Sequence, residues 1–475
     1  MKILELENTN LSDAQFVDFL YIIGDLLPRP LRSRMDVDEY AKKLKMNAEI
    51  FVAFDNDGDL AGLMCLYANN MSSKEAYLPF IGIIPSFQGK GLGRTMMQRA
   101  IAIARQKHMQ SINLEVGPDN LKAQNLYEKL GFMFTNKTGN SWHMKLEIPK
   151  IFDFGTSSFI TPLQKINKVE SLLGLDIDLR IKRDDLFGMP GGGNKARKIQ
   201  YILRHAIEQG YTALVTNGGP QSNHARATAI VAAQYGLHCH LAIPLKQNKN
   251  YLNTGNILLM RMAGATIEFC ELSQLAQKMD SAMEVLGSQG HKPLYIWGGG
   301  HCVQGTEPFV DAVDEFRTQA NGWEPDYMVF ASGTGTTHAG FSIGFANSNT
   351  KVVGISVARD SQRGASIVQQ SIGEYQEYKN MPQRSIPVHF RDEWTCGGYE
   401  LYNEHLLKII SMAARAGLFV DPTYSGKAFT GLVDMVKSKE IPPGSKVLFW
   451  HTGGLLNIMA CQEFVNSDPF LKPIT

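Results

Sequence analysis

Lys195 follows three glycines and an asparagine at the start of a predicted amphipathic helix, in the stretch PGGGNKARKIQYILRHA, residues 190–206. Glycines let the backbone approach a ligand closely, and a helix N-terminus favours anionic groups. A lysine at this place can therefore act on a bound molecule. A glycine-rich helix start beside a lysine is also common in ordinary loops, so the rest of the chain has to decide.

Two further segments carry polar residues between a predicted strand and a predicted helix. TNGGPQSNHARATA places Gln221, Ser222, Asn223 and His224 at a helix start, where parallel sheets meet ligands, although such a run also caps an ordinary helix. FASGTGTTHAG offers amides and hydroxyls to a phosphate, or is simply a flexible polar loop. Its residues are Ser332, Gly333, Thr334, Gly335, Thr336 and Thr337. No Gly-Lys-Ser/Thr closes it, so it is not a Walker loop.

Two more side chains, Tyr424 in DPTYSGKAF and Thr452 in FWHTGGLL, stand at the ends of predicted strands or loops. A pyridoxal phosphate site needs a lysine that binds the cofactor covalently, a phosphate loop, an asparagine for the phenolic oxygen and a hydroxyl for the ring nitrogen. The segments around Lys195, Asn223, residues 333–337 and Thr452 supply these parts. They indicate pyridoxal phosphate chemistry.

Nearer the N-terminus, YLPFIGIIPSFQGKGLGRTMMQRAIAIARQK predicts a strand ending near Pro85, a glycine loop and a helix. Met97, Ala100, Ile101 and Ala104 fall on one face of that helix. The loop has the spacing Q-x-x-G-x-G over Gln88, Gly91 and Gly93, so its amides suit a pyrophosphate. A structural turn would show the same glycines.

The segment INLEVGPDNLKAQNLYEKLGF then gives a strand and Asn120, Ala123, Leu126, Tyr127 and Gly131 in the spacing N-x-x-A-x-x-L-Y-x-x-x-G. With the glycine loop, it resembles motifs A and B of the GNAT acetyltransferases over about the first 150 residues. The resemblance implies acetyl-CoA, with Asn120 beside it and its pyrophosphate on the amides of Gln88, Gly89, Gly91 and Gly93.

The GNAT resemblance also implies catalytic roles for Tyr127 and Glu115. Tyr127 is the proton donor to the leaving thiolate, for which an intrinsic pKa of about 10 is suitable, and its alternative is a packed helix tyrosine. Glu115 resembles the general base of the acetyltransferases that modify ribosomal-protein N-termini. Gly117 stands where several of those relatives carry a larger residue, so their peptide specificity does not carry over.

Residues 155 to 470 resemble fold type II pyridoxal phosphate enzymes, and within them D-cysteine desulfhydrase and 1-aminocyclopropane-1-carboxylate deaminase. The resemblance rests on the segments IKRDDLFGMPGGGNKARK, QSNHARATA, TGNILLMRMAGA, SGTGTTHAGF, DPTYSGKA and HTGG. It implies that Lys195 binds the cofactor covalently, that residues 333–337 bind its phosphate, that Asn223 contacts the ring hydroxyl and that Thr452 contacts the ring nitrogen.

On the substrate side, the same resemblance implies that Ser222 and His224 face the substrate carboxylate, with Gln221 beside them. It also implies that Tyr399 and Tyr424 flank the substrate. The neighbourhood of Tyr399, RDEWTCGGYE, matches the family only through its glycines and the ring, and a surface tyrosine is the alternative.

One departure separates the two relatives. Deaminases that open the cyclopropane ring carry a glutamate directly after the second tyrosine, whereas Ser425 follows Tyr424 here. A hydroxyl such as that of Thr452 cannot stabilise a protonated ring nitrogen as a carboxylate would. The chain is therefore expected to expel a good β leaving group rather than to open a ring.

These residues need elements to position them. Pro149 and a Gly, Thr and Ser cluster follow a strand-like segment that ends about Ile148, which predicts a GNAT domain over 1–150, a linker over 151–160 and a second domain over 161–475. Beyond Thr161, strand, glycine turn and helix alternate, as in YTALVTNG and HARATAIVAAQYG. The predicted fold class is α/β: a GNAT fold with a mixed sheet, then two open parallel α/β subdomains.

Composition limits the partners. With 47 basic and 46 acidic residues, neither nucleic acid nor a membrane is predicted as a partner. Six scattered cysteines without a C-x-x-C pair predict reduced, buried thiols and no metal site. An N-terminus with Glu5, Glu7 and Asp13 lacks the apolar core of a signal peptide, which favours the cytoplasm. The family resemblance adds an expected homodimer formed through the second domain.

The combined expectation is a bifunctional enzyme. It transfers acetyl from acetyl-CoA to a small amine and performs β-elimination or β-replacement on a small amino acid, of D configuration by family analogy. The alternatives are a racemase or ring-opening deaminase, and a GNAT domain that senses acetyl-CoA without turnover. The two activities combine if the lyase makes an amino acid that is then N-acetylated, or if O-acetylation creates the leaving group that the lyase expels.

Overall fold

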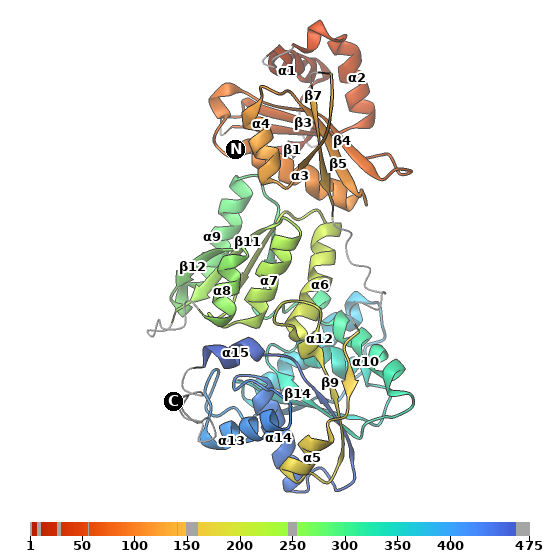
Figure 1. Cartoon of the computed structure of the whole chain (residues 1–475), viewed down its shortest axis with the longest axis vertical. Helices are drawn as coiled ribbons and strands as arrows, with labels where there is room; N and C mark the ends of the chain where they lie inside the picture. Colours follow the sequence, from red (N-terminus) through yellow and green to blue (C-terminus); the bar gives the residue numbers. More distant parts are fainter. Residues whose placement is uncertain are drawn as a thin grey trace.

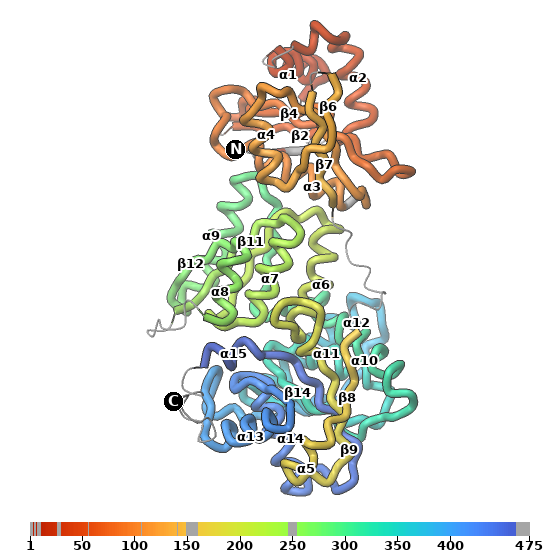
Figure 2. Tube along the Cα trace, in the orientation of Figure 1, coloured from red at the N-terminus to blue at the C-terminus, as the bar shows by residue number. Residues whose placement is uncertain are grey.

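A computed structural model describes residues 2–6, 11–25, 30–55, 57–139, 141–148, 160–245 and 254–461. In these residues the strands form three sheets, which follow one another along the long axis of the molecule (Figure 1). Figure 2 shows the N-terminal part at one end, the green part in the middle and the blue part at the other end. The yellow segment, residues 160–185, lies with the blue part rather than with its neighbours in sequence.

The first sheet is seven-stranded and mixed, in the order β1-β2-β3-β4-β5-β7-β6. Its strands are β1 (Lys2–Glu5), β2 (Glu49–Phe54), β3 (Leu60–Tyr67), β4 (Glu75–Ile83), β5 (Ser111–Val116), β6 (Met133–Thr138) and β7 (Ser141–Glu147). Its helices are α1 (Asp13–Asp25), α2 (Val37–Asn47), α3 (Leu92–Gln106) and α4 (Leu121–Lys129). The apolar face predicted for α3 is buried, as its 3.6-residue period requires.

One parallel pair in this sheet opens toward its end. β4 and β5 are paired only from Glu75 opposite Ser111 to Leu78 opposite Leu114. Beyond that point β4 continues through residues 79–83 without a partner on β5. The two strands therefore leave exposed backbone and space between them, next to the starts of α3 and α4.

The second sheet is four-stranded and parallel, in the order β12-β11-β10-β13. Its strands are β10 (Ala213–Asn217), β11 (His238–Pro244), β12 (Thr266–Cys270) and β13 (Pro293–Ile296). The helices that accompany it are α6 (Gly193–Glu208), α7 (Asn223–Gln234), α8 (Gly255–Met262) and α9 (Leu275–Ser288). Buried alanines of α7 let it lie close to the sheet.

The third sheet is six-stranded, in the order β16-β15-β14-β17-β9-β8, and parallel except for β8 against β9. Its strands are β8 (Leu163–Gln164), β9 (Asp178–Lys182), β14 (Tyr327–Ser332), β15 (Lys351–Ser356), β16 (His389–Arg391) and β17 (Lys446–Trp450). Its helices are α5 (Asn167–Leu173), α10 (Glu307–Ala320), α11 (Thr336–Gly344), α12 (Ser361–Tyr378), α13 (Glu404–Arg415), α14 (Ser425–Lys437) and α15 (Leu455–Ala460).

Short 3₁₀ turns link several of these elements, at Leu31–Ser33, Pro85–Phe87, Asp184–Leu186, Leu272–Gln274 and Val303–Gly305. The predicted alternation of strand, glycine turn and helix is confirmed by β10 with α7, β11 with α8 and β14 with α11. The predicted α/β class, with a mixed sheet followed by two open sheets that are mainly parallel, is confirmed. The linker predicted over 151–160 lies, but for residue 160, outside the described residues.

The thiol prediction needs a correction. All six cysteines are free, but only Cys65, Cys239 and Cys270 are buried, whereas Cys302, Cys396 and Cys461 are partly exposed. Cys396 itself has a positive φ of 54°, which is uncommon for a residue other than glycine. Within the described parts of the chain, no helix is long and apolar enough to cross a membrane.

Candidate active sites

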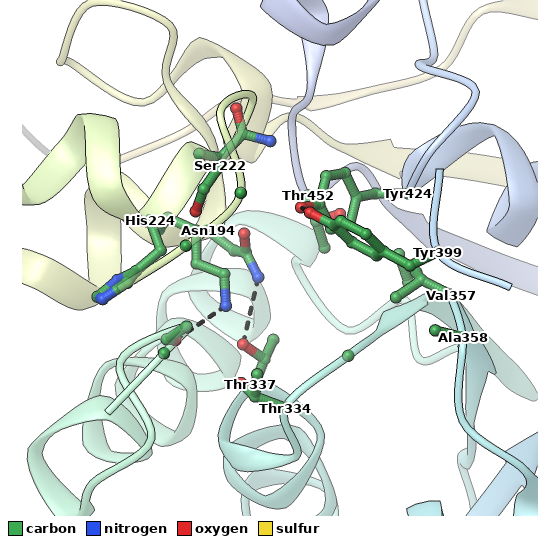
Figure 3. A pocket seen from close by; sticks show the side chains of 18 of the residues that line it. Asn194, Ser222, His224, Thr334, Thr337, Val357, Ala358, Tyr399, Tyr424 and Thr452 are labelled. Atoms are coloured by element: carbon green, nitrogen blue, oxygen red, sulfur yellow. Dashed lines mark hydrogen bonds between the residues drawn. The ribbon is translucent and has the colours of Figure 1, made fainter. Parts of the chain in front are cut away.

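The larger candidate site is a cavity of about 660 Å³ between the second and third sheets. Its walls are the loops that follow β10, β13, β14, β15 and β17, together with the first turn of α6. Parallel strands place their C-terminal ends at one edge, where ligands of α/β sheets bind. Figure 3 shows Asn194, Ser222 and His224 on one side of it and Tyr399, Tyr424 and Thr452 on the other.

Lys195 reaches this cavity because of the glycines before it. Residues 191–193 all have positive φ, and a Cβ on Gly192 would lie 2.1 Å from the carbonyl oxygen of Asp185. Only glycine fits such a close backbone approach. The Nζ of Lys195 donates to the carbonyl oxygen of Gly299 at 3.0 Å. Removal from water lowers the pKa of Lys195 to about 8, so the amine reaches its neutral, nucleophilic form readily.

A second lysine, Lys198, lies one helical turn further along α6 and is fully buried. Its Nζ donates to Gly299 O at 3.1 Å and to Thr336 Oγ1 at 2.6 Å. Burial, followed by the neighbouring charge of Lys195, lowers the pKa of Lys198 well below its ordinary value. Thr336, predicted in the phosphate loop, therefore accepts from Lys198 with its hydroxyl oxygen, and it does not line the cavity.

The predicted phosphate loop lies between β14 and α11. Gly333, Thr334, Gly335 and Thr337 line the cavity, and the helix starts at their end, so its free amides face the same space. Gly335 has φ +104°, and a Cβ there would lie 2.8 Å from Ile367 Cγ2. Asn194 Nδ2 donates to Thr337 Oγ1 at 3.2 Å, which ties the loop to the helix that carries Lys195 (Figure 3).

Ser222, Asn223 and His224 begin α7 and line the cavity. Ser222 Oγ accepts from Ala225 N at 3.2 Å and so caps the helix while facing the cavity. Asn223 Oδ1 accepts from Asn256 Nδ2 at 3.0 Å, which leaves its amide nitrogen as the donor for a ligand. The predicted cluster is thus brought together: Ser222 caps the helix, and all three residues line the cavity.

His224 is held in one neutral tautomer. Thr216 Oγ1 donates its single proton to Ile296 O at 2.7 Å, so Nε2 of His224, 2.9 Å from Thr216 Oγ1, must carry the proton it donates. Burial, then the charges of Lys195 and Lys198, lower its pKa well below 6.5. His224 is therefore a neutral group whose Nδ1 accepts.

Gln221, predicted beside the substrate, is not among the residues that line the cavity. Its Oε1 accepts from Asn256 N at 2.9 Å, and its Nε2 donates to Thr254 O at 3.0 Å. Its carbonyl oxygen accepts from Asn457 Nδ2 at 3.1 Å. Gln221 thus ties the start of α7 to α8 and α15.

Tyr399 and Tyr424 stand together on the opposite wall, with their hydroxyls hydrogen-bonded to each other and their rings nearly perpendicular (Figure 3). Burial raises the pKa of both phenols, so both remain protonated. Tyr399 is therefore a cavity residue rather than a surface tyrosine. Asp421, fully buried, accepts from the backbone amides of Thr423, Tyr424 and Ser425 and so fixes the tyrosine's loop.

Burial raises the pKa of Asp421 to about 6. Ser425, which stands where the ring-opening relatives carry a glutamate, donates its hydroxyl to Asp421 Oδ1 at 2.7 Å. It is fully buried and does not line the cavity. The position after Tyr424 therefore contributes no acid to the site.

The cavity fits pyridoxal phosphate by charge and shape. Its lining residues include Lys195, Arg359 and Arg363 but no aspartate or glutamate, which suits a phosphate dianion. Arg359 also donates to the carbonyl oxygen of Gly333 at the phosphate loop. Thr452 lines the cavity on the side opposite Ser222 and His224 (Figure 3), and its carbonyl oxygen accepts from Asn194 N at 3.0 Å. Lys195 would hold the cofactor, Thr452 would contact its ring, and the loop before α11 would bind its phosphate.

A second candidate site lies where β4 and β5 open. A cavity of about 630 Å³ is lined by Gln88, Gly89, Gly91, Gly93 and the facing side of α4. Gln88 Nε2 donates to Ile83 O at 3.0 Å, which holds the loop against the end of β4. Gly89 and Gly91 have positive φ, and nothing lies within 4 Å of where their Cβ atoms would be. Asn120 caps α4 by accepting from Ala123 N at 3.2 Å and also lines this cavity.

A smaller cavity of about 280 Å³ lies on the other side of the same opening and is lined by Glu115, Asp119, Tyr77 and Arg34. Tyr127, Asn120 and Ile81 line both cavities, so they connect at this point. Burial raises the pKa of Tyr127 to about 12, above the ordinary value of about 10 that the sequence led us to expect. Tyr127 stays protonated and can donate. Tyr77 donates to Glu115 Oε1 at 3.3 Å.

Several residues of these sites have no counterpart in the sequence-based prediction. Asn194, Arg359 and Arg363 line the larger cavity, and Arg34 lines the smaller one. Lys198 does not line the cavity but shares the acceptor Gly299 O with Lys195. Arg359 follows β15, and the rule that ligands meet strand C-terminal ends applies to that strand as well. Arg34 has no such signal, because it comes from the turn before α2.

Comparisons with known proteins agree with these two sites. Residues 157–453 match the family described as pyridoxal-phosphate dependent enzymes, and residues 18–132 match the GNAT acetyltransferase family. D-cysteine desulfhydrase of Serratia proteamaculans is 35% identical over 306 residues, 62% of this chain and 91% of that protein. D-cysteine desulfhydrase of Klebsiella pneumoniae is 33% identical over 308 residues, with the same coverage.

Among solved structures, a protein described as an ACC deaminase homologue has 33% identity and a TM-score of 0.60. The match covers 67% of this chain and 99% of that one. The chain is an enzyme that belongs to the pyridoxal-phosphate dependent family, and it carries a GNAT acetyltransferase domain on the N-terminal side of its pyridoxal-phosphate domain.

Proposed function

We propose that the second domain binds pyridoxal phosphate and eliminates or replaces the β substituent of a small amino acid, in the manner of a D-cysteine desulfhydrase. The observation that carries this proposal is that one cavity is lined by Lys195, by the loop at the start of α11 and by Thr452. No aspartate or glutamate lines this cavity. When bound, the cofactor withdraws electrons from the substrate's α-carbon. The relatives' names support D-cysteine as a substrate, and thus the D configuration.

Each lining residue has a proposed task. Lys195 holds the cofactor, and its amine, with a pKa of about 8, then moves a proton at the substrate α-carbon. Asn223 donates to the ring hydroxyl oxygen. Ser222 would donate its hydroxyl to the substrate carboxylate, whereas His224, neutral and with only its accepting Nδ1 free, cannot donate to that carboxylate. Tyr399 and Tyr424 are both protonated and hydrogen-bonded to each other, so one of the two hydroxyls would be left to donate to the departing β group.

The hydroxyl of Thr452 supports elimination over the alternatives. A hydroxyl beside the ring nitrogen would stabilise its protonated form less than a carboxylate would, so a cofactor held there would supply only a moderate electron sink. Such a sink would favour expelling a good β leaving group over racemisation. Ring opening is disfavoured further, since Ser425 hydrogen-bonds with Asp421 and offers no carboxylate to the cavity.

We further propose that the first domain transfers acetyl from acetyl-CoA to an amine. The diphosphate would lie on the amides of residues 88–93, and the thioester would reach Tyr127, where the two cavities connect. Tyr127 would protonate the leaving thiolate, and Glu115 would take the proton of the attacking amine. These roles agree with the opening between β4 and β5, which exposes backbone for the pantetheine amides.

The acceptor cavity favours a free α-amino acid. Its volume of about 280 Å³ suits a small molecule, and it offers Arg34 to a carboxylate and Glu115 to an ammonium group. An amino acid carries both groups at once. We therefore favour β-replacement that makes an amino acid, followed by its N-acetylation. An N-acetylated substrate has no free amine to react at Lys195, so the reverse order is excluded.

The test supplies a thiol, a β-substituted D-amino acid and acetyl-CoA together to the full chain. The expected product is an N-acetylated amino acid, and Tyr127→Phe is expected to accumulate the free amino acid instead. If Tyr127→Phe abolishes consumption of D-serine while O-acetyl-D-serine is still consumed, the first domain makes the leaving group. If neither domain's variant changes the other's substrate, the two activities are unconnected.

The proposal also includes domain bounds, an oligomeric state and a location. The domain bounds are 1–150, 151–160 and 161–475. The homodimer through the second domain rests on family resemblance, and the cytoplasmic location rests on composition. Sedimentation of the full chain would test the homodimer.

A further inference from the structure

A cavity of about 460 Å³ lies between the first and second sheets. On one side it is lined by α3, the end of α4 and the end of β7, and on the other by the α7 to β11 loop and the end of α8. Figure 1 shows α3 facing the near ends of α6 and α9. Neither candidate active site includes this space, and its lining comes from both domains.

The lining is rich in basic side chains. Arg94, Arg105 and Lys129 come from the first domain, and His238, which becomes positive only when protonated, comes from the second. The lining acid is Glu147, which is exposed and already paired with Lys145 at 2.9 Å. The cavity therefore carries net positive charge at a place where two domains meet, and an anion there would offset that charge.

Arg105 is the deepest of these cations, with 7% of its surface exposed. Its guanidinium lies over the ring of Tyr235, 5.9 Å from the ring centroid, and its Nε has no hydrogen-bond partner among the described residues. Burial lowers its pKa to about 10. A buried guanidinium without an acidic partner is costly, which indicates that a ligand completes the site.

Two histidines extend the cluster on the second domain. The rings of His238 and His291 lie 5.5 Å apart, and Arg94 is near enough to act on both. Burial first, and then His238 and Arg94, lower the pKa of His291 to about 4. All three groups become positive when protonated, so each disfavours the charge of the others until an anion is present.

Arg94 and Lys129 identify the anion, because they line the cavity of residues 88–93 as well. The acyl-CoA proposed for that cavity continues from its diphosphate into an adenosine that bears a 3′-phosphate. The shared residues mark where the two cavities adjoin. We propose that the phosphorylated adenosine end of acyl-CoA binds in the cavity between the domains, with Arg94 and Lys129 on one side and His238 on the other.

This inference rests on the proposed acetyl-CoA site and adds that the second domain supplies part of it. The acyl donor would then span the contact between the domains. A phosphate would form a charge-assisted bond with Lys129, and also with His238 because the anion favours the protonated imidazole. Removing the 3′-phosphate should therefore weaken binding measurably.

The test measures binding of CoA and of 3′-dephospho-CoA to the full chain by calorimetry. The unaltered protein is expected to bind CoA about tenfold more tightly than the dephospho form. His238→Gln and Lys129→Ala should each bring that ratio close to one. Lys122→Ala is the matched control, since Lys122 is on the same helix and lines only the cavity of residues 88–93. It should weaken both ligands alike.

A CoA to dephospho-CoA ratio that stays the same in His238→Gln overturns this inference and leaves the proposed acetyl transfer standing. An absence of CoA binding by the unaltered protein overturns both. A third arm uses inorganic phosphate alone. If phosphate raises the melting temperature, loses that effect in His238→Gln, and the two CoA forms bind equally, the cavity is a site for a free anion and the inference fails. Cofactor absorption at Lys195 confirms folding of each variant.

Discussion

Lys195 and Lys198 share one acceptor, the carbonyl oxygen of Gly299, at 3.0 and 3.1 Å from their Nζ atoms. Two ammonium groups this close, both removed from water, repel each other. The pKa values of both amines are lowered, so both lose their protons more easily. Lys198 also donates to Thr336 Oγ1. Lys195, which faces the cavity, is the one left free to react.

The rate at which cofactor-free protein captures pyridoxal phosphate should follow this lowered pKa. With a pKa of about 8, roughly one Lys195 in ten is neutral at pH 7, and the fraction rises toward pH 8 and levels off above it. An ordinary lysine would keep gaining neutral amine beyond pH 10. Reconstitution followed by visible absorption between pH 6.5 and 9.5 measures this. A rate that still climbs steeply at pH 9.5 would contradict the assignment.

Lys195→Ala should lose the visible absorption of the bound cofactor and reduce lyase activity by about 100-fold or more, the usual effect of losing an acid–base group. Acetyl transfer should survive, because the opening between β4 and β5 contains no part of α6. Comparing both activities in one preparation separates a local loss from misfolding. Elimination at the unaltered rate in this variant would refute the role of Lys195.

Thr452→Asp should change the partition of the reaction. A carboxylate beside the ring nitrogen favours its protonated form, which stores electrons longer and should increase racemisation and transamination at the expense of elimination. The ratio of racemised to eliminated substrate measures this, and Thr452→Ser, which keeps the hydroxyl, is the control. If the partition is the same in all three proteins, Thr452 does not contact the ring.

Glu115→Gln should lower acetyl transfer by about 100-fold, as expected when a general base is lost. Tyr77→Phe removes only the hydrogen bond to Glu115 and should have a smaller effect, because the carboxylate itself remains. Turnover of acetyl-CoA with a panel of small amino acids compares the two variants. Full activity in Glu115→Gln would make this carboxylate structural.

Much of the fold could be predicted because local signals agree with it. The glycine turns and apolar strands around β10, β14 and β17 are short-range sequence patterns. Each strand ends in a glycine-containing loop, as expected in a parallel sheet. The residues that the sequence identified in the larger cavity mostly follow such strand ends. Sequence order alone indicates which loops meet there.

The rest of the site depends on contacts between distant segments. Nothing local distinguishes Gln221, which bonds with α8 and α15, from Ser222, which faces the cavity. The partnership of Lys198 with Thr336, and the hold of Asp421 on the loop of Tyr424, likewise arise only when elements pack. For the same reason, the cation cluster between the domains has no sequence signature.

The backbone contact at the start of α6 also sets an order of events. Asn194 N bonds to Thr452 O, and a Cβ on Gly193 would lie 2.8 Å from that same oxygen, so the first turn of α6 rests directly on the segment after β17. β17 is the last strand of the described chain, and it must be in place before Lys195 has its final position. During synthesis the acetyltransferase domain can finish folding early, while the cofactor site matures only once β17 and the segment after it have left the ribosome.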